Sequence, residues 1–125
     1  MRQPGSRSAV AHVADSLRWS LAGWRAAWAS ERSLRLWVLA NAVSAGLALI
    51  LPLGIWQRGA IIALGVLVLA AELLNTAIET VVDMVAPGPD PRAARAKDCA
   101  SAAVALAAIA AGTAWAAALW SLAAG

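Results

Sequence analysis

The sequence has 125 residues, of which 62% are hydrophobic, and its mean hydropathy is +0.70. A soluble domain of this length has too little interior to bury so much apolar surface, so a soluble enzyme is excluded. The formal charge is +3, and the single cysteine, Cys99, excludes an intramolecular disulfide. We therefore expect one compact helical bundle in a membrane, with the Cys99 thiol buried and any active site built by the helices themselves.

The N-terminal part of the chain is polar at first and then amphipathic. Residues 1–8 contain a proline and a glycine, which predicts a flexible tail. Over residues 9–33, apolar side chains recur at helical spacing, and three arginines flank the ridge that they form. This pattern predicts a helix lying in the membrane interface, where arginines reach anionic lipid headgroups. The ridge consists of Leu17, Leu21, Trp24 and Trp28, and the arginines are Arg18, Arg25 and Arg32.

Three hydrophobic segments follow, at about residues 36–53, 59–86 and 98–123. Each is close to the roughly 20 residues that a helix needs to cross a bilayer. The third segment is rich in alanine, which favours close packing against other helices. The sequence therefore predicts an all-α membrane protein in which residues 9–125 form one domain, with an interfacial helix and three transmembrane helices.

Basic residues are unevenly distributed between the predicted loops. Six arginines precede the first span, and Arg92, Arg95 and Lys97 lie near the second loop, whereas the first loop has Arg58 alone. Because cytoplasmic loops carry the excess of lysine and arginine, we expect the N-terminus and the second loop to be cytoplasmic. A basic segment beside a membrane span is typical of contact with anionic lipid, so we expect no nucleic-acid partner.

The second hydrophobic segment contains four polar residues, Glu72, Asn75, Glu79 and Asp83, at spacings of three, four and four. At about 3.6 residues per turn, these spacings place all four on one face of a helix. An acidic residue inside a span costs about 2.5 to 3.5 kcal/mol on insertion scales, which indicates a functional site. A structural hydrogen-bond ladder explains Asn75 alone, because three carboxylates repel one another unless a cation, a proton or a basic group is shared.

A second set of polar residues is expected at the same end of the bundle. Glu31 lies near the end of the interfacial helix, and Lys97, Asp98 and Ser101 lie at the start of the third span. Beside several carboxylates, a lysine is suited to bind phosphate. The carboxylates are suited to Mg²⁺, which takes one or two of them together with substrate phosphates. The two sets predict a site for a magnesium-bound phosphate compound.

Four strings are informative when they are read together: GWRAAW at 23–28, ERSLR at 31–35, AELLNTAIETVVD at 71–83 and RAKDCASAAV at 95–104. In this order, around three spans, they closely resemble the prokaryotic diacylglycerol kinase family, which also includes undecaprenol kinases. The resemblance covers nearly the whole chain from about residue 12. It implies a homotrimeric enzyme of the bacterial inner membrane that transfers the γ-phosphate of MgATP to the primary hydroxyl of diacylglycerol.

The resemblance also implies roles for individual residues. Glu72 matches the general base for the lipid hydroxyl, with Asn75 beside it in the catalytic site. Glu31 and Glu79 match the carboxylates that hold the metal bridging the ATP phosphates. The nucleotide-binding residues are then Trp19, Glu31, Glu79, Asp83, Asp90, Lys97 and Asp98. The residues that match the lipid-binding cleft are Ser16, Arg25, Ala26, Ala27, Trp28, Arg35, Glu72 and Ser101.

Other functions fit parts of the pattern. GWRAAW and RAKDCASAAV are more similar to diacylglycerol kinases, whereas ERSLR is closer to the undecaprenol kinases. A small proton-coupled carrier also needs intramembrane acids, but it needs them through the whole depth of the membrane. Here the charged residues of the second and third spans gather towards the predicted cytoplasmic end, which favours an interfacial enzyme. A structural subunit would leave the carboxylates unexplained.

Overall fold

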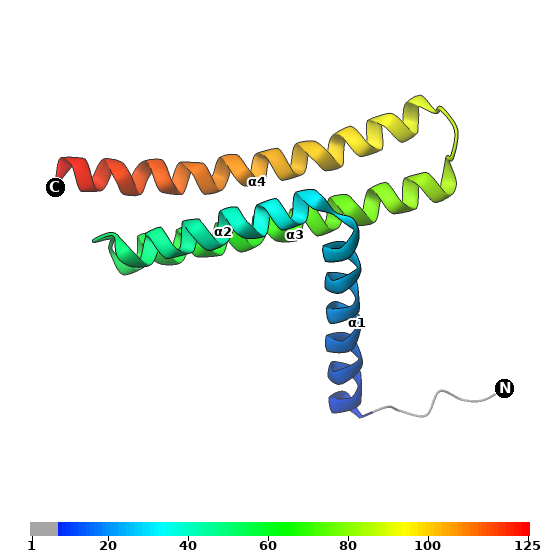
Figure 1. Cartoon of the computed structure of the whole chain (residues 1–125), viewed down its shortest axis with the longest axis horizontal. Coiled ribbons are helices and arrows are strands. Elements are labelled where there is room, and N and C mark those ends of the chain that lie inside the picture. The colour runs from blue at the N-terminus through cyan, green and yellow to red at the C-terminus, as the bar shows by residue number, and fades with distance from the viewer. Residues whose placement is uncertain (1–7) are drawn as a thin grey trace.

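The computed structural model describes residues 8–125, which form four helices with short connections (Figure 1). The helices are α1 (Ala9–Ser30), α2 (Arg32–Ile50), α3 (Ile55–Val85) and α4 (Pro91–Ala124). The last three are long and apolar enough to cross a membrane. The prediction of an all-α protein with an N-terminal helix and three spans is therefore confirmed. Residues 1–7 of the predicted tail lie outside the described residues.

Two helix ends differ from the boundaries expected from hydropathy. α1 ends at Ser30 and not at residue 33, because Glu31 has an extended backbone with φ −107° and ψ 107°. α4 begins at Pro91 and not at residue 98. Its start is determined by capping, since Pro91 suits a first helical position and the Asp90 carboxylate accepts a hydrogen bond from the Arg92 N–H at 2.8 Å. Hydropathy misses this start because the first turns of α4 are polar.

The three long helices lie side by side and share a common direction. Helix α1 extends away from them, crosswise to that direction (Figure 1). Helices α2 and α3 are joined by a short turn at residues 51–54. This arrangement lets α2, α3 and α4 cross a bilayer while α1 lies along its surface. In that arrangement, the α1–α2 junction would be the level at which the chain passes from the surface into the membrane.

Helix α3 is much longer than α2, with 31 residues against 19. At about 1.5 Å per residue these lengths are roughly 46 Å and 28 Å. Since the two helices share one end at the 51–54 turn, α3 extends past the start of α2 together with the first turns of α4 (Figure 1). We call this part of α3 and α4, residues 75–101, the projecting hairpin. It carries Glu79, Asp83, Asp90, Lys97 and Asp98.

The single chain has a small core. Its largest fully buried side chains are Leu34, Ile61 and Val68. Large apolar side chains remain exposed on the outer faces of all four helices, which fits contact with lipid or with another subunit. The expectation of a buried Cys99 was wrong: it is exposed, because the buried positions of α4 nearby are Ala100 and Val104.

Side-chain hydrogen bonds connect α2 to its neighbours. The Trp115 Nε1–H donates to Ser44 Oγ at 2.8 Å and thereby links α4 to α2. The Arg58 guanidinium donates to the carbonyl oxygens of Ala48 and Leu51, each at 3.0 Å. These carbonyls lie at the C-terminal end of α2, where helical partners are missing. Arg58 therefore stabilises the turn between α2 and α3 by satisfying these carbonyl oxygens.

Helices α2 and α3 approach each other closely where Asn41 meets Gly65. The Asn41 side chain donates from Nδ2 to the carbonyl oxygen of Trp37 at 3.0 Å, and its Oδ1 lies against Gly65. A Cβ atom at position 65 would be only 2.1 Å from Asn41 Oδ1. The absence of a side chain at Gly65 therefore provides the space that Asn41 occupies, as small residues commonly do between membrane helices.

We expect Gly65→Ala to destabilise the folded chain by about 1–3 kcal/mol, the usual range for overpacking a close contact. The new methyl group displaces Asn41 and breaks its bond to Trp37. The measurement is the unfolding midpoint in detergent. Adding Asn41→Ala should recover most of the loss, and Gly112→Ala is the matched control, because a Cβ atom at Gly112 meets nothing within 4 Å. Equal stability of Gly65→Ala and the parent chain would contradict this account.

Candidate active site

Glu72 is buried where α3 passes the α1–α2 junction. It is only 5% exposed, and it is the one buried polar or charged residue within residues 8–125. The Ser33 hydroxyl, on the first turn of α2, donates to Glu72 Oε1. Because α1 ends at this level, Glu72 lies beside the surface helix and below the projecting hairpin. The carboxylate is therefore placed between the membrane-spanning part of the chain and the part that extends beyond it.

Asn75 and Glu79 continue the same face of α3, one and two turns further along. Asn75 Nδ2 donates to Glu79 Oε1 at 3.1 Å, which confirms that these two residues share a face. Asn75 Oδ1 is buried and has no hydrogen-bond partner within residues 8–125. A buried acceptor without a partner costs about 1–3 kcal/mol, so this oxygen is suited to accept a hydrogen bond from a ligand or from water.

Asp83 and Lys97 join the two helices of the projecting hairpin. Lys97 Nζ lies 2.5 Å from Asp83 Oδ1, and Glu79 is also close enough to interact electrostatically with the ammonium group. Helices α3 and α4 run in opposite directions, so Ser101, four residues after Lys97, comes level with Glu79. Asp98 and Ser101 are exposed. The structure thus brings Glu79, Asp83 and Lys97 together on the hairpin.

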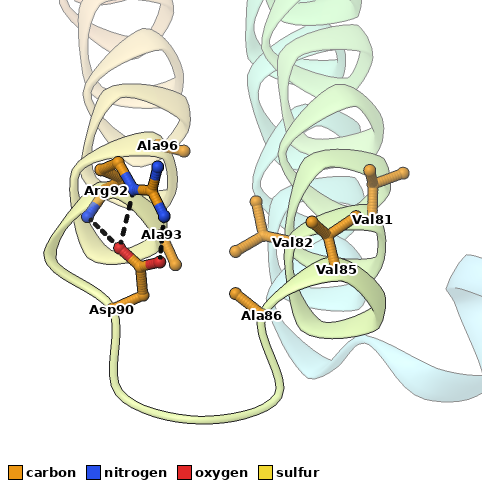
Figure 2. A pocket seen from close by; sticks show the side chains of 8 residues that line it. All are labelled: Val81, Val82, Val85, Ala86, Asp90, Arg92, Ala93 and Ala96. Atoms are coloured by element: carbon orange, nitrogen blue, oxygen red, sulfur yellow. Dashed lines mark hydrogen bonds and ion pairs between the residues drawn. The ribbon is translucent and has the colours of Figure 1, made fainter.

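A hollow of about 410 Å³ lies between the end of α3 and the start of α4. Figure 2 shows valines of α3 on one side and the Asp90–Arg92 pair on the other. Arg92 lies 3.0 Å from the Asp90 carboxylate. Its guanidinium and then its backbone N–H, with a smaller contribution from the Ala93 N–H, hold the pKa of Asp90 below its usual range. Asp90 is thus ionised at neutral pH, and its carboxylate caps α4.

The predicted lipid-binding residues of α1 lie near the junction or along the outer surface. Arg35 donates from its guanidinium to the carbonyl oxygen of Trp28 at 2.6 Å, which ties α2 back to the end of α1. The Trp24 and Trp28 rings stack with centroids 6.4 Å apart. Ala27 is buried at the junction. Within residues 8–125, no hydrogen bond or ion pair joins the acids of α3 to four other exposed residues of α1, namely Ser16, Trp19, Arg25 and Ala26.

The two predicted metal ligands lie at the same end of the molecule. Ser30 Oγ donates to Glu31 Oε1 at 3.2 Å, and Asn75 holds Glu79 Oε1. Within residues 8–125 there is neither a direct bond between Glu31 and Glu79 nor a group of three or more potential metal-binding side chains. Each carboxylate nevertheless has a second oxygen available. Carboxylates are ligands of the kind that Mg²⁺ takes, one or two at a time, together with water and phosphate oxygens.

Sequence reasoning missed one residue of this site, Ser33. It lies two residues after Glu31 in a stretch of mixed polarity, and no spacing rule singles it out. Its importance becomes visible only when α2 is placed against α3, which brings its hydroxyl to a carboxylate 39 residues away in the sequence. Two signals were available: Ser33 is the last residue of the predicted surface helix, and it lies within the ERSLR string at 31–35.

The sequence is similar to those of known proteins. The family described as "Prokaryotic diacylglycerol kinase" matches residues 18–119. A diacylglycerol kinase of Pseudomonas aeruginosa is 37% identical over 97 residues, which cover 78% of this chain and 79% of the relative. A diacylglycerol kinase of Escherichia coli is 38% identical over 103 residues, covering 82% and 84%. One from Haemophilus influenzae is 32% identical over 106 residues, covering 85% and 90%. The chain is therefore a member of the prokaryotic diacylglycerol kinase family of multi-pass membrane proteins.

Proposed function

We propose that this protein is a diacylglycerol kinase that transfers the γ-phosphate of ATP to the primary hydroxyl of diacylglycerol and releases phosphatidic acid. The observation that supports this most directly is the position of Glu72. A buried carboxylate at the level of the surface helix can meet a lipid hydroxyl. The groups of α3 and α4 that are suited to phosphate and cation begin two turns further along, at Glu79 on the projecting hairpin.

In this proposal Glu72 is the general base. Its second oxygen takes the proton of the lipid hydroxyl while the hydroxyl oxygen bonds to the γ-phosphorus atom. The bond from that phosphorus to the β–γ bridging oxygen breaks, and ADP leaves. Asn75 Oδ1, which lacks a partner within residues 8–125, accepts a hydrogen bond from a water molecule beside the lipid hydroxyl, since the single proton of that hydroxyl goes to Glu72. Both groups lie on one face of α3.

The nucleotide is expected along the projecting hairpin. Glu31 and Glu79 would hold Mg²⁺, which neutralises phosphate charge when it is bound. Lys97, oriented by Asp83, contacts the phosphates. The nucleotide site that we propose also includes Asp98 on α4, Asp90 at the N-cap of α4, and Trp19 on α1. Phosphoryl transfer needs mainly positioning and charge neutralisation, so no separate nucleotide-binding domain is required.

The lipid is expected between α1 and the spans. The residues of α1 that we assign to the lipid site are Arg25, Ala26, Ala27 and Trp28. Arg35 binds the carbonyl oxygen of Trp28 and thereby holds the end of α1 in place. Ser16 on α1 and Ser101 on α4 also belong to the lipid site that we propose. Arginine side chains on α1 lie where they can contact the headgroups of neighbouring anionic lipids.

We further propose that the enzyme is a homotrimer in the bacterial inner membrane, with its N-terminus in the cytoplasm. The chain alone leaves Asp98 and Ser101 exposed and buries few of its large apolar side chains, so neighbouring copies supply the missing walls of the site. The arginines before α2 and the basic residues near the second loop support the cytoplasmic orientation, because cytoplasmic loops carry such an excess.

The experiment is a phosphorylation assay on the purified protein in mixed micelles with MgATP. Diacylglycerol and undecaprenol are offered separately, and the labelled lipid product is quantified. We expect diacylglycerol to be the faster substrate. Faster phosphorylation of undecaprenol would reassign the acceptor, and no phosphorylation of either lipid would refute the kinase proposal. Proton flux into proteoliposomes without ATP would instead support a carrier.

A further inference from the structure

The hydrogen bond from Ser33 to Glu72 lies in the most buried part of the candidate site. Ser33 Oγ donates to Glu72 Oε1, and within residues 8–125 this is the hydrogen bond that the Glu72 carboxylate receives. Ser33 is itself partly buried, and the bond joins α2 to α3. Since Glu72 is almost fully enclosed, few other donors reach this oxygen.

A carboxylate that acts as a base must present one oxygen to the substrate in a fixed direction. Without a partner, the Glu72 carboxylate can turn about its last bond, and its two oxygens exchange places. The Ser33 hydroxyl holds Oε1 and so leaves Oε2 directed away from α2. We propose that Ser33 is a positioning residue that orients Glu72 for proton abstraction, an inference that rests on the proposed role of Glu72 as the base.

The surroundings of Ser33 keep its hydroxyl in place. Its neighbour Leu34 is fully buried, and Arg35 binds the carbonyl oxygens at the end of α1. Two turns further along α2, the contact between Asn41 and Gly65 sets how α2 lies against α3. The backbone at Ser33 therefore cannot shift along α3 without breaking several contacts, as expected of a residue that orients another.

A serine near the start of a helix often has a different task, which is to cap the helix by accepting a backbone N–H. The structure assigns no such bond to Ser33, and α2 has no side-chain cap. If Ser33 merely supported the fold, its loss would lower stability without a selective effect on turnover. The two roles are therefore separable by experiment.

The test compares Ser33→Ala and Ser33→Thr in the full-length protein, assayed with MgATP and diacylglycerol. We expect Ser33→Ala to lower kcat by about tenfold or more, as loss of a hydrogen bond to a charged group does. The KM for MgATP should stay unchanged. Ser33→Thr, which keeps the hydroxyl, should restore kcat to within about threefold. Thr113→Ala is the matched control, because its hydroxyl bonds the Ile109 carbonyl within α4.

Three outcomes would overturn the inference. They are an unchanged kcat in Ser33→Ala, a loss of kcat that Ser33→Thr does not restore, and a loss that only follows a lower unfolding midpoint. Glu72→Gln is measured in parallel to separate this inference from the proposed function. If Glu72→Gln retains turnover, the base assignment itself fails. If Glu72→Gln is inactive and Ser33→Ala is fully active, the positioning role alone fails.

Discussion

Glu72→Gln should lower kcat for lipid phosphorylation by about 10²- to 10⁴-fold, the usual contribution of a general base. Glutamine has nearly the same size as glutamate, and its carbonyl oxygen can still accept the Ser33 hydrogen bond. The variant therefore keeps the packing around position 72 and loses only the ability to take a proton. The measurement is the initial rate of phosphatidic acid formation at saturating MgATP and diacylglycerol.

The matched control for this substitution is Asp15→Asn on α1. It also replaces a carboxylate with an amide, at a position where the carboxylate pairs with Arg18 at 3.2 Å. We expect it to leave turnover unchanged. Both variants should show the same unfolding midpoint in detergent as the parent chain. Turnover by Glu72→Gln within a few fold of the parent would show that another group takes the proton.

Glu79→Gln is expected to raise the Mg²⁺ concentration needed for half-maximal activity by about tenfold or more. Even an outer-shell partner of a metal ligand changes metal affinity by about 10- to 100-fold, and loss of a direct ligand should do at least as much. The glutamine oxygen can still accept from Asn75 Nδ2, so the helix face keeps its internal bond. The measurement is the rate as a function of free Mg²⁺ at fixed ATP.

Asp83→Asn provides the comparison on the same helix face. Asp83 holds Lys97, so its loss should act on nucleotide binding and raise the KM for ATP more than the Mg²⁺ requirement. Both variants remove one negative charge from the projecting hairpin, and they are therefore equivalent in net charge. If the two substitutions shifted the Mg²⁺ requirement equally, a specific metal role for Glu79 would be contradicted.

The stripe on α3 shows how far local periodicity reaches. Glu72, Asn75, Glu79 and Asp83 were expected on one helix face from their spacing alone, and the bond between Asn75 and Glu79 confirms part of that expectation. Neighbours on one helix are predictable in this way because helix geometry is nearly invariant. The same reasoning placed Lys97 at the right end of the bundle, but it did not identify Asp83 as its partner.

Amino-acid composition and hydropathy were sufficient to predict the membrane class and the three spans, since the bilayer accepts only long apolar helices or closed barrels. The motif strings were sufficient to predict the family. Both properties depend on local sequence. The tertiary structure alone decided that Ser33 reaches Glu72 and that Gly65 makes room for Asn41. These contacts join different helices, and their partners depend on how the helices are rotated and shifted against each other, which no spacing within one helix can specify.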